Sequence, residues 1–185
     1  ETSLPLISPT TSIAGYLTDV GAVLSGLPVG LPVAVGTGDD FAALLGCGIS
    51  QPGTVCVTIG TGEIIGALVE KLVIDTDQLV ETHIFCTGHY HLGNPGWLSG
   101  GAIRWFLNTF SVKDDAEFSA LAAQAPPGCD GLLFIPALTG ATAPQWLDKA
   151  RGTFHGMTTS QTKSHFARAI LEGTSFAMRD VIDRL

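Results

Sequence analysis

Two adjacent carboxylates, Asp39 and Asp40, follow a glycine turn at residues 36–38 that ends a short apolar β-type run at residues 32–35. Ligands of α/β sheets bind beyond the ends of strands, so carboxylates here are well placed to reach one. A carboxylate within hydrogen-bond reach of a hydroxyl can act as its general base. The alternative is structural, because acidic side chains also suit the first turn of a helix, and a helical pattern follows. On this stretch alone, the structural role is favoured.

A second candidate is the tight turn formed by Gly60, Thr61 and Gly62 between two β-type runs. Backbone N–H groups in such a glycine turn are free to face phosphate oxygens, and Thr61 adds a hydroxyl. No Gly-Lys-Ser or Gly-Lys-Thr follows, so this is not a Walker A loop. An ordinary hairpin turn is the alternative interpretation.

A third candidate is the glycine pair Gly100 and Gly101, which opens an expected helix containing Arg104 and Trp105. Bare backbone at the start of a helix allows a nucleotide to approach closely. The alternative, a loop end packed on the core with Trp105 as an anchor, has equal weight.

Histidines gather at His83, His89 and His91. No conventional zinc spacing joins the three, and His83 falls in an expected strand. We therefore interpret them as polar side chains that face solvent or a partner, and we expect no metal site from this chain.

Periodicity and turn residues predict the elements that position these candidates. Alternating residues predict strands at 54–59 and 63–69, joined by the glycine turn into a hairpin. The other expected elements are a short helix at 18–25 within an otherwise loop-like segment 1–31, a strand at 82–86, a loop at 89–98, helices at 102–110 and 114–123, a buried strand at 131–136, a loop at 139–152, and a last helix capped by Ser160. This mixture predicts an α/β fold with a mixed sheet.

Composition narrows the function classes. The chain of 185 residues is 45% hydrophobic and 14% charged, with a net charge of −8, which is typical of a globular domain. It has no Lys or Arg run for nucleic acid, no apolar run that would span a membrane, and no signal-peptide core. Four cysteines without a C-x-x-C pair indicate reduced thiols in a cytoplasmic protein. Both ends look internal to a longer chain.

Taken together, the motifs resemble the FGGY carbohydrate kinases over essentially the whole chain. The order of Gly38-Asp39, the 60–62 turn and the Gly100 pair is similar to that family. Residues 152–157, a spacer of seven residues and residues 165–172 match the family's second signature at every position. Residues 134–136, Ala143, Pro144, Trp146 and residues 150–152 resemble the segment that precedes that signature.

The resemblance implies an actin-like ATPase (ribonuclease H-like) domain, with residues 1–185 forming most of the second, C-terminal kinase domain. The N-terminal sugar-binding domain and the final adenine-site segment would then be absent, so the chain alone should have little or no activity. Its partners would be a small sugar or polyol, the missing domain and, as one candidate assembly, a second copy in a homodimer.

The resemblance also implies residue roles. Asp39 would be the base that deprotonates the acceptor hydroxyl before it attacks the γ-phosphate of ATP, and Asp40 would contact the acceptor. Mg²⁺ would bridge the phosphates. The nucleotide-binding residues would be Gly60, Thr61, Gly62, Gly100 and Arg104.

The acceptor is the least constrained feature. Asp40 stands where the family more often has Asn, Gln or His, and residues 140–142 replace a Gly-Glu-Arg common in xylulose and gluconate kinases. The sequence as a whole resembles xylulose kinases most, so D-xylulose is the expected acceptor. Gluconate and glycerol are the alternatives. Two other classes remain open: a non-catalytic actin-like module that binds sugar or nucleotide, and a regulatory fragment that pairs with a separate chain.

Overall fold

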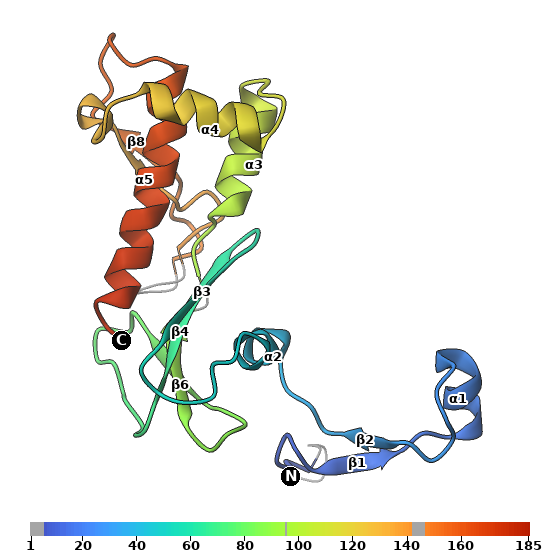
Figure 1. The fold of residues 1–185 in the computed structure, drawn as a ribbon. Coiled ribbons are helices and arrows are strands. Elements are labelled where there is room, and N and C mark those ends of the chain that lie inside the picture. The colour runs from blue at the N-terminus through green and yellow to red at the C-terminus, as the bar shows by residue number, and fades with distance from the viewer. Residues whose placement is uncertain (1–5, 95, 142–146) are drawn as a thin grey trace.

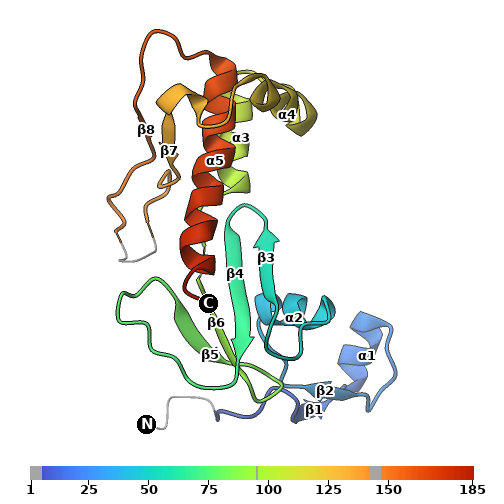
Figure 2. The ribbon, with the colours of Figure 1, turned by 60° about the vertical axis from the view of Figure 1, so that its left-hand side comes forward.

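The computed structural model describes residues 6–94, 96–141 and 147–185. Ala143, Pro144 and Trp146, which carry part of the family resemblance, and Thr142, which belongs to a departure from it, lie outside these residues. Within them the chain forms an N-terminal arm, a four-stranded sheet and a helical layer (Figures 1 and 2). No helix in this part of the chain is long and apolar enough to cross a membrane.

The N-terminal arm, residues 6–36, extends away from the rest of the molecule (Figures 1 and 2). It pairs β1 (Ile13–Tyr16) antiparallel with β2 (Pro32–Ala34) and connects them through α1 (Asp19–Ser25). The sequence predicted the helix but not β1, because β1 depends on pairing with β2, which is distant in the sequence. No residue of α1 is buried, and the apolar side chain of Val23 is 85% exposed.

After the arm, α2 (Asp39–Gly46) packs on one face of the sheet through a small core of Leu44, Ile49, Leu68 and Phe85. The sheet is built from β3 (Val55–Ile59), β4 (Glu63–Val69), β5 (Glu81–Ile84) and β6 (Tyr90–Asn94), in the order β3-β4-β6-β5. Every ladder between the described strands is antiparallel, and parallel pairing is confined there to an isolated Leu138–Gly140 bridge.

β6 corrects a sequence expectation, because residues 89–98 were interpreted as a loop. The segment contains Gly93 and Asn94, which both have low strand propensity. In the structure it lies between β4 and β5 and pairs with both, so long-range ladder bonds override local propensity. The predicted hairpin of β3 and β4 is confirmed, with Ile59 opposite Glu63.

The helical layer contains α3 (Gly100–Thr109), α4 (Asp115–Gln124) and α5 (Lys163–Ile182), beside a short helix η1 (Cys129–Gly131) and the paired strands β7 (Leu133–Ile135) and β8 (Thr153–His155). Its core centres on Phe106, Phe118, Leu132 and Ile170. Gly173 lets α5 approach β7, because a Cβ there would lie 2.2 Å from the carbonyl oxygen of Phe134.

The start of α5 is a second correction. Ser160 was expected to cap this helix, but the N-cap is Thr162, whose backbone N–H donates to His165 Nδ1 over 3.1 Å. Ser160 instead bonds Thr158 in the preceding turn. Both candidates are hydroxyl residues two positions apart, so the sequence alone does not choose between them.

Candidate functional site

The glycine turn between β3 and β4 is tied to the start of α3 by backbone hydrogen bonds. The N–H of Gly100 donates to the Gly60 carbonyl over 3.2 Å, and the N–H of Gly101 donates to the Thr61 carbonyl over 2.8 Å. A Cβ on Gly100 would lie 2.2 Å from the Gly60 oxygen. Glycine at this position is therefore what allows the two segments to meet.

A cavity of about 580 Å³ opens where these segments meet. It is lined by Gly60, Thr61 and Gly100 from the backbone segments and by Arg104 one turn along α3. The structure thus brings together four of the residues that the sequence singled out for nucleotide binding. Gly62 lies beside the cavity at the end of the turn, where its carbonyl accepts the Gly60 N–H over 2.8 Å.

This cavity has the properties of an anion site. The N-terminus of a helix carries partial positive charge, and α3 starts at the cavity wall with its first two N–H groups bonded to the turn. The exposed guanidinium of Arg104 adds a full positive charge. Asp115, from the first turn of α4, is a carboxylate that also lines it.

Asp39 and Asp40 are the first two residues of α2, and both are exposed. The N-cap is Gly38, so neither aspartate caps the helix, and both lie in its first turn, where the helix dipole favours carboxylates. Among the described residues, the Asp39 carboxylate accepts a short-range bond, from the Asp40 N–H to Asp39 Oδ1 over 3.1 Å. The Asp39 carboxylate is therefore open to a ligand at the end of β2.

Asp40 also lines a separate cavity of about 200 Å³ between α2 and the sheet, together with Ile64, Glu81, His83 and His91. The sequence predicts that both histidines face solvent or a partner, and His83 is exposed. His91 is instead buried, with 4% of its surface exposed. Residues 91–94 of β6 are all buried, so no alternation along the strand marks His91 as a buried residue.

Glu63 is a second residue that the sequence analysis missed. It follows the glycine turn directly and is fully buried, and neither carboxyl oxygen has a hydrogen-bond partner among the described residues. Burial raises the pKa of Glu63 to about 7, and the neighbouring Ser99 hydroxyl opposes this shift without completing a well-formed bond. The signal was an acidic residue opening an otherwise apolar strand.

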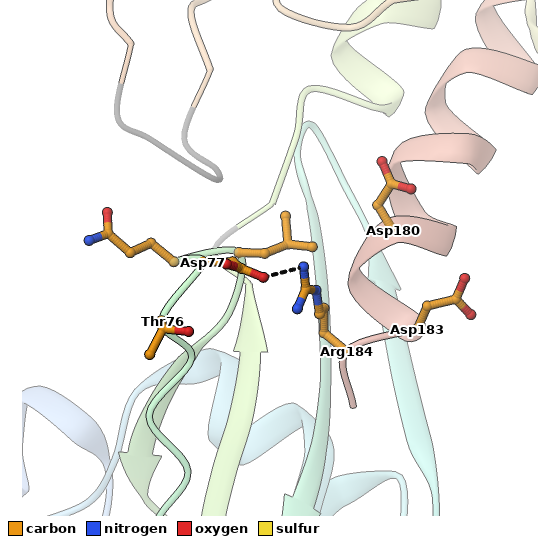
Figure 3. Close-up of a pocket in the computed structure, with 7 residues that line it drawn as sticks. Thr76, Asp77, Asp180, Asp183 and Arg184 are labelled. Carbon is orange, nitrogen blue, oxygen red and sulfur yellow. Dashed lines mark ion pairs between the residues drawn. The ribbon is translucent and has the colours of Figure 1, made fainter.

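A larger cavity of about 710 Å³ lies between the loop that precedes β5 and the end of α5 (Figure 3). Thr76, Asp77, Asp180, Asp183 and Arg184 line it, and Arg184 pairs with Asp77 over 2.6 Å. None of the residues singled out from the sequence lines this cavity. Among the described residues, no group of three or more His, Cys, Asp or Glu side chains is arranged to hold a metal ion.

Comparison with known proteins connects these features. Residues 55–185 match the model of the "FGGY family of carbohydrate kinases, C-terminal domain". A gluconokinase of Bacillus subtilis is 30% identical in an alignment that covers 96% of this chain and 37% of the gluconokinase. The chain therefore spans little more than a third of the length of such relatives.

Solved structures of carbohydrate kinases also superpose on this chain. The xylulose kinase from Rhodospirillum rubrum superposes with a TM-score of 0.81 at 32% identity, covering 96% of this chain and 36% of that one. The glycerol kinase of Plasmodium falciparum with ADP superposes with a TM-score of 0.79 at 26% identity, covering 98% and 36%.

Proposed function

Because this chain belongs to the FGGY family of carbohydrate kinases, we propose that it is part of an enzyme that transfers the terminal phosphoryl group of ATP to a hydroxyl of a sugar or polyol. Its fold is the actin-like ATPase fold of that family. The observation that carries the proposal is the cavity in which the glycine turn meets the start of α3.

The phosphates of ATP fit this cavity for physical reasons. The N-terminus of α3 lies at the cavity wall, and the partial positive charge of a helix N-terminus favours a phosphate beside it. The Thr61 hydroxyl and the Arg104 guanidinium add a donor and a positive charge on either side. A relative with ADP, the P. falciparum glycerol kinase, supports a nucleotide in this role.

Asp39 is proposed as the general base. Its exposed carboxylate takes the proton from the acceptor hydroxyl as the hydroxyl oxygen forms a bond to the γ-phosphorus. The bond from that phosphorus to the bridging oxygen breaks in the same step, and ADP leaves with the electron pair. Asp40, the next residue, is proposed to contact the acceptor.

Mg²⁺ is the proposed metal. The carboxylate of Asp115 lines the cavity, and the described residues include no group of three or more side chains that could hold a metal ion. These residues suit an ion that is held mainly by phosphates and water. When bound, the ion would neutralise charge on the phosphates.

D-xylulose is the proposed acceptor, supported by the likeness to the R. rubrum xylulose kinase. Gluconate and glycerol are the alternatives, since a gluconokinase and a glycerol kinase are also similar to this chain. We further propose that residues 1–185 form most of the C-terminal domain, that an N-terminal domain completes the acceptor site, and that the enzyme is cytoplasmic, where ATP is available.

The test is ATP consumption by the full-length protein with a panel of D-xylulose, other ketoses, polyols and D-gluconate. Phosphorylation of one acceptor above the background rate of ATP hydrolysis is the expected result. ADP binding without turnover on any acceptor would contradict the kinase assignment and favour a nucleotide-binding module.

A further inference from the structure

The cavity between α2 and the sheet begins one residue after the proposed base. Asp40 forms one wall and Ile64, Glu81, His83 and His91 form the others. Its volume of about 200 Å³ is below the ~300–1,000 Å³ of ordinary ligand pockets, so it suits one end of a small molecule. Asp39 would face the reacting end of an acceptor whose other end lies here.

His91 gives this cavity an unusual wall. The residue is 96% removed from solvent, and neither ring nitrogen has a hydrogen-bond partner among the residues that the structure describes. The ring lies against glycine backbone, because a Cβ on Gly66 would be 2.0 Å from Nε2. Unpaired buried polar atoms cost stability, which favours a role that repays the cost.

Phe41 and His83 hold the His91 ring in place. The His91 centroid lies 5.2 Å from that of Phe41 and 6.3 Å from that of His83. His83 and His91 are also paired residues on β5 and β6.

The charges around the cavity select among ligands. Asp40 and Glu81 are carboxylates, and Glu81 Oε1 lies 3.0 Å from His83 Nε2. Burial, followed by the charge of His83, lowers the pKa of His91 from its ordinary value, with a smaller opposing effect of Glu81, so its ring is neutral at pH 7. A neutral imidazole offers one donor and one acceptor, and carboxylates offer acceptors alone.

Hydroxyl groups match this arrangement, because each can donate to a carboxylate and accept from an imidazole N–H. A carboxylate ligand cannot donate, and it would face Asp40 and Glu81 as like charges. We propose that this cavity holds the non-reacting end of a neutral, hydroxyl-rich acceptor, and that Asp40 and Glu81 disfavour acceptors ending in a carboxylate. The proposal rests on the proposed kinase function and narrows its acceptor class to ketoses and polyols.

The test compares acceptors in the full-length protein. ATP consumption would be measured with D-xylulose, xylitol and glycerol as neutral acceptors and D-gluconate as the anionic one. The variant is Glu81→Gln, and Glu70→Gln is the matched control because Glu70 is an exposed carboxylate beyond the end of β4. Wild type and control should prefer neutral acceptors. Glu81→Gln should lower the kcat/KM ratio of neutral acceptor to gluconate roughly three- to tenfold.

His91→Phe gives an independent measurement, since it keeps a ring and removes both unpaired nitrogens. The KM for the neutral acceptor should rise several-fold while the melting temperature stays level or increases. An unchanged KM with a raised melting temperature would assign His91 a structural role and overturn its part in the cavity.

The remaining outcomes separate this proposal from the kinase function. Turnover that favours gluconate, with a ratio unaffected by Glu81→Gln, would overturn the cavity proposal and leave the kinase intact. Absence of turnover with every acceptor would overturn the kinase function. Calorimetric binding of xylitol or D-xylulose, weakened by His91→Phe, would then still support the cavity, and no binding would overturn both.

Discussion

The backbone N–H of Gly100 donates to the carbonyl oxygen of Gly60 over 3.2 Å, although the two residues are far apart in the sequence. This bond places the N-terminus of α3 directly on the turn between β3 and β4. It is the contact that joins two separate glycine motifs into one cavity, the proposed phosphate site.

Gly100→Ala tests that contact. The added Cβ would lie 2.2 Å from the Gly60 oxygen, so the turn and the helix must separate. We expect ADP affinity to fall at least about tenfold and stability to fall by ~1–3 kcal/mol, as for other overpacked sites. Calorimetric titration with ADP and thermal unfolding of the full-length protein measure the two effects.

Gly46→Ala is the control for that substitution. Gly46 ends α2, and a Cβ there meets no heavy atom within 4 Å. This variant should bind ADP as the wild type does. Equal ADP affinity in Gly100→Ala and Gly46→Ala would show that the meeting of turn and helix does not form the nucleotide site.

Arg104→Ala tests the proposed charge in the cavity. The guanidinium is exposed and lines the cavity wall, so its loss should weaken a charge-assisted bond to phosphate worth ~1.5–3 kcal/mol in favourable geometry. We expect the KM for ATP to rise about tenfold and the thermal stability to stay the same. Arg179→Ala is the control, because Arg179 lies in the last turn of α5 and pairs with Asp183. A similar loss in both variants would point to general charge instead of a specific contact.

Glu63 predicts a pH dependence of stability. Its pKa is about 7 in the folded protein and 4.5 ordinarily, so the folded state holds a proton that the unfolded state releases between these values. Stability should therefore fall as pH rises from about 4.5 to about 7. Glu63→Gln removes this penalty and should be more stable than wild type at pH 8, by on the order of 2–3 kcal/mol, and similar to it near pH 4.

Denaturant unfolding of the full-length protein across this pH range measures the difference. Glu70→Gln, at the exposed position beyond the same strand, should follow the wild-type profile. If Glu63→Gln also follows that profile, the Glu63 carboxyl is ionised in the folded protein without penalty.

Local sequence patterns predicted the elements that carry the site. The glycine turn, the β3–β4 hairpin and the helix starting at Gly100 depend on residues close together in the chain, and the structure has them. The carboxylates Asp39 and Asp40 lie in the first turn of α2 as the helix dipole favours.

Long-range pairing and burial were harder to predict. β6 is a strand because both its neighbours pair with it, which the local sequence around Gly93 does not reveal. The burial of Glu63 and His91 follows from what covers each side chain, and their residue types indicate exposure. The hydrogen bond from Gly100 to Gly60 likewise depends on tertiary packing.

The most direct test of the kinase account is the turnover number of Asp39→Asn in the full-length protein with its best acceptor. Asp19→Asn is the matched control, because Asp19 is the exposed first residue of α1 as Asp39 is of α2. The account predicts that kcat falls by a factor of ~10² to 10⁴ in Asp39→Asn, with ADP affinity preserved, and stays at the wild-type value in Asp19→Asn. An Asp39→Asn enzyme as fast as the wild type would contradict the assignment of Asp39 as the base.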